Sequence, residues 1–128
     1  MKVIEGKLAI AVVDDDRRVL ESLEDLLESA GYVVLTFTGP GALLSSNHSA
    51  IDCLITDIGM PVMDGFALSK AVRDSHPSLP VFMITGRYES GDQSRALSED
   101  AKGFFRKPFD PQRLLLEVNR VLGGTHGG

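Results

Sequence analysis

The sequence contains a single cysteine, no long apolar run and no excess of basic residues. Cys53 has no partner cysteine and lies inside an apolar run, so we expect a reduced, structural thiol. No apolar run approaches the ~18 residues that a membrane-spanning helix needs, and the N-terminus lacks a signal-peptide pattern. These absences predict a soluble cytoplasmic protein that has no membrane partner.

Charge, composition and length narrow the class further. Thirteen Lys and Arg against eighteen Asp and Glu give a net charge of −5, whereas a nucleic-acid binder usually presents a basic face to phosphates. We therefore expect no direct nucleic-acid binding by this chain. Hydrophobic residues make up 43% of the 128 residues, which suits one folded domain and excludes a chain that is disordered throughout.

Short apolar runs alternate with helical segments along the chain. The runs are Leu8–Val13, Tyr32–Phe37, Ile51–Thr56, Val81–Thr85 and Gly103–Arg106. Largely unbroken runs suit strands that are buried on both faces, as in parallel sheets. Strand followed by helix, five times over, predicts an α/β fold with helices on both faces of the sheet and right-handed crossovers. Five strands are too few for a closed barrel of eight, so an open, doubly wound (βα)5 sheet is expected.

The helical segments differ in the strength of their pattern. From Val19 to Ala30 apolar residues repeat at three- and four-residue steps, with Asp16 placed to cap the helix and Gly31 to end it. Weaker patterns predict further helices at Pro40–Ser45, around Phe66–Val72 and from Pro111 to Leu122.

Two segments toward the C-terminus depart from this regular pattern. Glu89–Asp100 carries only Ala96 and Leu97 as apolar anchors, so it should be the least firmly docked helix. Residues 123–128 are rich in glycine and are expected to form a flexible tail or the start of a linker. The folded domain is then expected to comprise residues 1–122.

Polar side chains gather where the predicted strands end. In chain order they are Asp14, Asp15, Asp16, Asp57, Thr85 and Lys107. The carboxyl ends of parallel strands meet at one edge of the sheet, so these groups should converge. Adjacent acids repel one another and raise their pKa values, a conflict that a hard divalent cation such as Mg²⁺ or Mn²⁺ resolves. Together with a hydroxyl and an ammonium group, they predict a phosphoryl-transfer site with a carboxylate nucleophile.

Each of these residues also has a purely structural interpretation. A run of Asp after a strand is often a turn and a helix cap, and Asp57 could open the loop before Gly59. Thr85 could simply end a strand, and Lys107 could be a solvated charge on an edge strand. Their expected convergence on one rim favours the functional interpretation.

Four motifs, in order and spacing, resemble those of the receiver domains of two-component response regulators. They are VVDDD at 12–16, TDIGMPVMDG at 56–65, MITG at 83–86 and FFRKPF at 104–109. The resemblance covers residues 8–122. It implies the three-layer fold of the chemotaxis receiver CheY, whose parallel sheet has strand order 2-1-3-4-5.

The resemblance also implies roles for the acidic residues. Asp57 would be the phosphoacceptor. Asp14 and Asp15 look like the acid pair that binds Mg²⁺, with Asp15 a direct ligand and Asp14 acting largely through water. Asp57 and the backbone carbonyl of Gly59 would complete the protein ligands of the metal.

Further residues of the motifs are assigned by the same resemblance. Thr85 and Lys107 would each bond a phosphoryl oxygen, and the bond from Lys107 to the following proline is usually cis in this family. Phe104 stands where an aromatic switch residue is expected, often a tyrosine, and lacks the hydroxyl. Gly59 cannot shield the phosphoryl group, and Arg87 could reach either that group or an acid, so the phosphoryl lifetime stays open.

The implied function is a phosphoacceptor signalling switch, not an enzyme beyond its own phosphorylation and dephosphorylation. A histidine kinase or phosphotransfer protein would donate the phosphoryl group. The surface around Glu89–Leu122 would then change and bind an effector domain or a downstream protein, with self-association on phosphorylation left open. The chain could stand alone or be the receiver portion of a longer response regulator. The alternative is a Mg²⁺-dependent phosphatase with Asp57 as nucleophile, although Gly59 stands where dehalogenase-like phosphatases place a second Asp.

Overall fold

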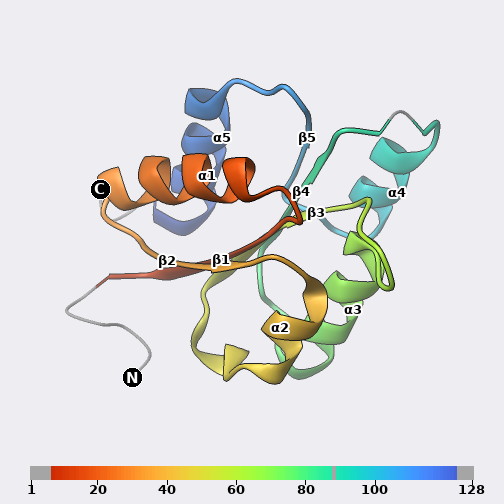
Figure 1. The fold of residues 1–128 in the computed structure, drawn as a ribbon, viewed down its shortest axis with the longest axis horizontal. Helices are drawn as coiled ribbons and strands as arrows, with labels where there is room; N and C mark the ends of the chain where they lie inside the picture. Colours follow the sequence, from red (N-terminus) through yellow and green to blue (C-terminus); the bar gives the residue numbers. More distant parts are fainter. Residues whose placement is uncertain (1–6, 88, 124–128) are drawn as a thin grey trace.

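A single parallel sheet forms the centre of the molecule (Figure 1). The computed structural model describes residues 7–87 and 89–123. Within these residues the sheet has five strands in the order β2-β1-β3-β4-β5, which confirms the expected fold and strand order. The strands are β1 (Ala9–Val13), β2 (Val33–Phe37), β3 (Cys53–Asp57), β4 (Val81–Thr85) and β5 (Gly103–Arg106).

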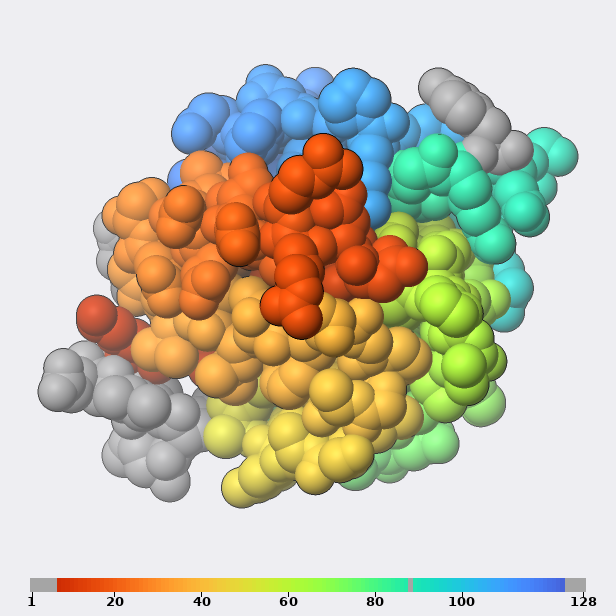
Figure 2. All heavy atoms as spheres, in the orientation of Figure 1, coloured from red at the N-terminus to blue at the C-terminus, as the bar shows by residue number. Residues whose placement is uncertain are grey.

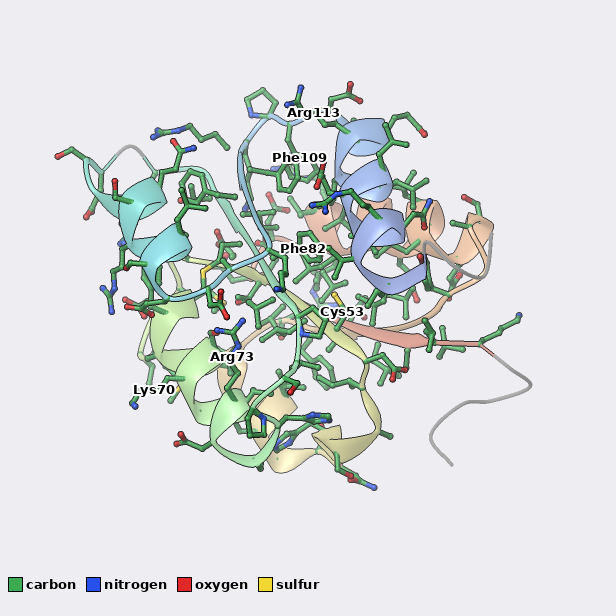
Figure 3. All side chains as sticks on the ribbon, turned by 180° about the vertical axis from the view of Figure 1, so that it is seen from behind. Cys53, Lys70, Arg73, Phe82, Phe109 and Arg113 are labelled. Carbon is green, nitrogen blue, oxygen red and sulfur yellow. The ribbon has the colours of Figure 1, made fainter. Side chains whose placement is uncertain are left out.

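Helices cover both faces of this sheet (Figure 1). They are α1 (Arg17–Ser29), α2 (Pro40–Ser45), α3 (Gly65–Ser75), α4 (Asp92–Ser98) and α5 (Pro111–Val118), with a 3₁₀ turn η1 (His48–Ala50) and a π turn η2 (Asn119–Gly123). Leu23 of α1 and Leu114 of α5 belong to one core layer, together with Cys53 and Phe82 (Figure 3). The other layer contains Leu43 of α2 and apolar residues of α3 and α4. The fold therefore has three layers, with the sheet between two layers of helices, as the alternation of strand and helix predicts.

The strand and helix ends follow local chemistry. Asp16 caps α1, since its side chain accepts a hydrogen bond from the Arg18 amide, and Gly31 follows the helix at a φ of +98°. The third strand begins at Cys53, not at Ile51, because Ile51 forms the cap of η1. Cys53 is fully buried and is a free thiol, as expected from its apolar surroundings.

Helix α4 is shorter than its sequence pattern predicts. It spans Asp92–Ser98 instead of Glu89–Asp100. Leu97, expected to be an anchor, is 62% exposed, so that prediction was wrong, while Ala96 is fully buried. The second buried side chain of α4 is the charged Asp92. A helix with a single small apolar anchor depends on other contacts to stay docked.

Of the expected tail, residues 124–128 lie outside the described part of the chain, which ends at Gly123, a buried residue of η2. The division at residue 122 therefore stays a prediction. None of the helices among the described residues is long and apolar enough to cross a membrane.

Candidate functional site

Three carboxylates meet at the carboxyl end of the sheet. Asp14 and Asp15 follow β1 and Asp57 ends β3, and these two strands are neighbours. One carboxylate oxygen from each of the three lies within 4.8 Å of the others. Asp14 is fully buried and Asp57 is 5% exposed, whereas Asp15 is exposed. The sheet thus brings together the acids that the sequence singles out.

Consecutive aspartates after β1 have different roles. Asp14 Oδ1 accepts a hydrogen bond of 2.9 Å from the Asp16 amide, which fixes the orientation of the Asp14 carboxylate. Asp16 in turn caps α1, because its side chain accepts a hydrogen bond from the Arg18 amide. The structural interpretation of this run is therefore correct for Asp16, and Asp14 and Asp15 form the cluster.

Lys107 provides the positive charge of the site. Its Nζ lies 2.7 Å from Asp14 Oδ2 and 3.6 Å from Asp57 Oδ1. Its amide donates to the Thr85 carbonyl over 2.7 Å, which holds the residue in place. The bond from Lys107 to Pro108 is cis, as the resemblance implied. Lys107 is therefore a partner of both buried acids and not a solvated charge.

Burial and neighbouring charges shift the pKa values of Asp57 and Lys107. Burial, together with the nearby charge of Asp14 and, less strongly, Asp15, raises the pKa of Asp57 from 3.8 to about 6, against the opposing effect of Lys107. For Lys107, burial alone would lower the pKa, but the bond to Asp14 and the charges of Asp14 and Asp57 together raise it. The site therefore combines a carboxylate whose ionisation is disfavoured with a lysine whose protonated form is favoured.

Gly65 allows α3 to begin directly against the loop that follows Asp57. A Cβ atom at Gly65 would lie 2.5 Å from the Asp57 carbonyl oxygen and 2.9 Å from the Ile58 Cα, both backbone atoms. The Gly65 amide donates to the Ile58 carbonyl over 2.9 Å, and Asp64 caps α3 through the Ala67 amide. Asp64 is thus the N-cap of α3, and the close approach of Gly65 fixes the backbone around Asp57.

Thr85 and Arg87 lie on the neighbouring loop, after β4. Thr85 is 1% exposed, and its Oγ1 accepts a hydrogen bond of 3.0 Å from the Arg87 amide. The sequence left open whether Arg87 would reach the phosphoryl position or an acid, and in this structure it reaches an acid, Asp92. Sequence reasoning missed Asp92, because an aspartate in the first turn of a helix is ordinary and carries no signal of its own.

The remaining predicted residues lie at the edge of the site. Gly59 is exposed on the loop after Asp57. Phe104 is half-buried on β5, packed against the core layer that contains Met83, with the Arg106 guanidinium 5.6 Å from its ring centroid. His48 and His76 bond backbone carbonyls, and the acidic cluster is the one group of three or more metal-binding side chains among the described residues.

The profile of the response regulator receiver domain matches residues 10–119. The chain belongs to this family. Receivers are the phosphoacceptor switches of two-component signalling, and they bind Mg²⁺ at an acidic site. The cluster of Asp14, Asp15 and Asp57 is an acidic site of that kind.

Curated relatives are longer than this receiver. Response regulator protein TodT of Pseudomonas putida is 33% identical over 114 residues, which are 88% of this chain and 50% of TodT. Response regulator SaeR of Staphylococcus epidermidis is 31% identical over 113 residues, which are 88% of this chain and 49% of SaeR. The receiver described here thus spans about half the length of these relatives.

Solved receivers have the same fold. Chemotaxis protein CheY4 of Vibrio cholerae superposes with a TM-score of 0.80 at 32% identity, covering 91% of this chain and 99% of CheY4. A CheY-like receiver domain protein of Methanospirillum hungatei gives a TM-score of 0.84 at 26% identity, covering 94% and 98% of the two chains. These likenesses agree with the family assignment.

Proposed function

We propose that Asp57 is the phosphoacceptor of this receiver. The observation that carries the proposal is the convergence of Asp14, Asp15 and Lys107 around one carboxylate at the end of β3. An oxygen of Asp57 forms a bond to phosphorus as the bond from phosphorus to a histidine nitrogen of the donor breaks. The product is an acyl phosphate on Asp57, and the buried setting of the carboxylate limits the approach of water.

We propose that Mg²⁺ is the cofactor, with Mn²⁺ as a substitute. The donor atoms fit a hard cation, because all are oxygens and two of the three clustered acids are buried beside like charges. Asp15 would bind directly and Asp14 largely through water, with Asp57 and the Gly59 carbonyl completing the set. When bound, the cation neutralises these acids and oxygens of the transferring phosphoryl group.

Thr85 and Lys107 would each bond one oxygen of the phosphoryl group. A hydroxyl has one proton to donate and two lone pairs, so Thr85 can accept from the Arg87 amide and still donate to a phosphoryl oxygen. Lys107 already lies 3.6 Å from Asp57 Oδ1, and its flexible stem lets the ammonium follow the new charge. Phe104, half-buried on β5, would be the switch residue that responds to a movement of Thr85.

The donor would be a histidine kinase or a phosphotransfer protein. A hollow of about 580 Å³ lies beside Lys107, between α1 and the segment from β5 to α5, and includes Val19, Phe109 and Pro111 in its lining. Figure 2 shows α1 in orange and the α5 region in blue meeting on one face of the molecule. A partner that seats an apolar side chain there would bring its phosphohistidine toward Asp57.

On the output side we propose that the surface around Glu89–Leu122 changes and binds an effector domain or a downstream protein. Self-association through this surface on phosphorylation is a second use of it. Residues 1–122 would form the domain, with residues 123–128 a tail or the start of a linker. We place the protein in the cytoplasm, with no membrane or direct nucleic-acid partner, in line with its net charge of −5.

We infer that the chain catalyses only its own phosphorylation and dephosphorylation. Incubation with acetyl phosphate should add one phosphoryl group to the intact mass in Mg²⁺ and none in chelator. Asp57→Asn should stay unlabelled, whereas Asp74→Asn, an exposed carboxylate on α3, should be labelled like wild type. Equal labelling of wild type and Asp57→Asn would refute the assignment, and sustained turnover of p-nitrophenyl phosphate would refute the non-enzyme inference.

A further inference from the structure

Polar contacts hold both ends of α4. The helix buries two side chains, Ala96 and Asp92. At its C-terminal end, Arg73 of α3 donates from Nη1 to the Glu99 carbonyl over 2.7 Å and from Nη2 to the Asp100 carbonyl over 3.0 Å. Figure 3 shows Arg73 extending from α3 toward this end of α4. With so little apolar burial, the position of α4 depends on such contacts.

Arg87 makes the corresponding contact at the N-terminal end. Its Nε lies 2.9 Å from Asp92 Oδ2, and its Nη2 lies 3.2 Å from Asp92 Oδ1. The Asp92 side chain is only 10% exposed, and the more exposed Glu89 lies 3.6 Å from Arg87 Nη1. A two-pronged, partly buried pair of this kind is among the stronger ion pairs in proteins.

The same arginine lies against the phosphorylation site. Its amide donates to Thr85 Oγ1 over 3.0 Å. Its side chain crosses Gly59, two residues after Asp57, where a Cβ atom would lie 3.4 Å from the Arg87 Cδ. Because Gly59 has no side chain, the Arg87 side chain can lie directly over the backbone of this loop. One residue thus touches both the phosphoacceptor loop and the first turn of α4.

We propose that Arg87 exchanges partners when Asp57 is phosphorylated, leaving Asp92 for the phosphoryl oxygens and so releasing the first turn of α4. This inference rests on the proposed function of Asp57. A guanidinium binds carboxylate and phosphate with the same planar fork, and the phosphoryl group offers the higher charge. Asp92, left almost buried without its cation, then moves toward water, because an unpaired buried carboxylate is costly. Since Arg73 still holds the other end, α4 pivots.

A double-mutant cycle tests this exchange. Wild type, Arg87→Gln, Asp92→Asn and the double variant are titrated with beryllofluoride in Mg²⁺. Asp92→Asn should tighten apparent beryllofluoride affinity about fivefold, because the competing partner of Arg87 is gone. In the Arg87→Gln background the same substitution should have no effect. Glu99→Gln is the matched control, because it removes the exposed Arg95–Glu99 pair of 2.8 Å at the far end of the same helix, and its affinity should equal that of wild type.

Amide hydrogen exchange supplies the second readout. In wild type, beryllofluoride should lower the protection of residues 92–98. In Asp92→Asn this protection should already be low, and beryllofluoride should change it little. Equal effects of Asp92→Asn in both backgrounds, or unchanged protection of residues 92–98 in wild type, would overturn the exchange.

Acetyl phosphate labelling separates this failure from that of the proposed function. If wild type is labelled at Asp57 while the cycle is additive, the partner exchange is wrong and the phosphoacceptor assignment stands. If wild type neither binds beryllofluoride nor becomes labelled at Asp57, the proposed function is wrong, and the partner exchange falls with it.

Discussion

Lys107 is bonded to Asp14 more closely than to Asp57, its partner in the proposed chemistry. The distances from Nζ are 2.7 Å to Asp14 Oδ2 and 3.6 Å to Asp57 Oδ1. Both carboxylates are nearly inaccessible to water, and the lysine side chain is 23% exposed. The ammonium therefore neutralises one buried acid in the unphosphorylated protein and stands within a short movement of the other.

Lys107→Ala should weaken both the fold and the chemistry. Removing the cation leaves Asp14 buried and unpaired, and we expect a loss of roughly 2 kcal/mol in the free energy of unfolding, below the buried-pair range because Lys107 is partly exposed. Labelling by acetyl phosphate should slow by about a hundredfold. Urea unfolding and a labelling time course measure the two effects. Lys70→Ala, an exposed lysine of α3, is the control, and similar behaviour of both variants would contradict this role.

Asp57→Asn should stabilise the metal-free protein, and more so at higher pH. The pKa of Asp57 is raised from 3.8 in the unfolded chain to about 6 in the fold. Protonated Asp57 therefore contributes to the free energy of unfolding below the unfolded pKa, and this contribution is lost as the pH rises through about 6. The ionised carboxylate is then a cost that asparagine does not carry. At about pH 8 the substitution should add roughly 2 kcal/mol to the free energy of unfolding, falling toward zero near pH 4.

Unfolding in chelator at several pH values measures this dependence. Asp15→Asn should also stabilise the metal-free protein, because it removes one of the charges that raise the pKa of Asp57. Asp74→Asn serves as the control for a lost surface charge. Destabilisation by both cluster variants would show that the acids are not in conflict.

Mg²⁺ should stabilise the protein by mass action. At a hundredfold excess over its dissociation constant, we expect about 2.7 kcal/mol if the ion binds the native state alone. Asp15→Asn should lose most of this gain, because it removes a proposed ligand. The variant is then expected to be more stable than wild type in chelator but to gain less stability from Mg²⁺. Thermal melts across a Mg²⁺ titration test this, and an equal gain in both proteins would exclude Asp15 as a ligand.

Phosphorylation should alter the surface around Glu89–Leu122 more than the rest of the protein surface. Thr85 is buried beside the site, and Phe104 is half-buried on the neighbouring strand, where space vacated by Thr85 can be filled. Hydrogen exchange with beryllofluoride and Mg²⁺ should therefore change across residues 86–106 and in α5. Changes confined to the loops after Asp14 and Asp57 would show that the signal does not leave the site.

Position along a parallel strand explains why so much of the site was predictable. The ends of neighbouring strands must meet at one edge of the sheet, so a sequence that places Asp14, Asp57 and Thr85 at strand ends also places them together. The order of the strands came from resemblance to a known family, because alternation alone fixes layers and handedness but not order.

The unpredicted details depend on side-chain reach and weak patterns. A lysine stem can serve either of two acids, so the closer bond from Lys107 to Asp14 has no signal in the sequence. Ala96 and Leu97 are the only apolar residues of α4, so the helix has no apolar stripe that determines which face is buried. In the structure Ala96 is buried and Leu97 lies on the exposed face. Pairing of Arg87 with Asp92 depends on the loop between them, which local propensity does not determine.

The most direct test of the central claim locates the phosphoryl group itself. Borohydride reduces an acyl phosphate of aspartate to homoserine, which marks the modified residue permanently. After treatment with acetyl phosphate and Mg²⁺, peptide mass spectrometry should find homoserine at position 57 and at no other aspartate. Homoserine at position 14 or 15 would contradict the assignment. An unmodified Asp57 after reduction would also contradict it, if the intact mass shows that the protein was phosphorylated before borohydride was added.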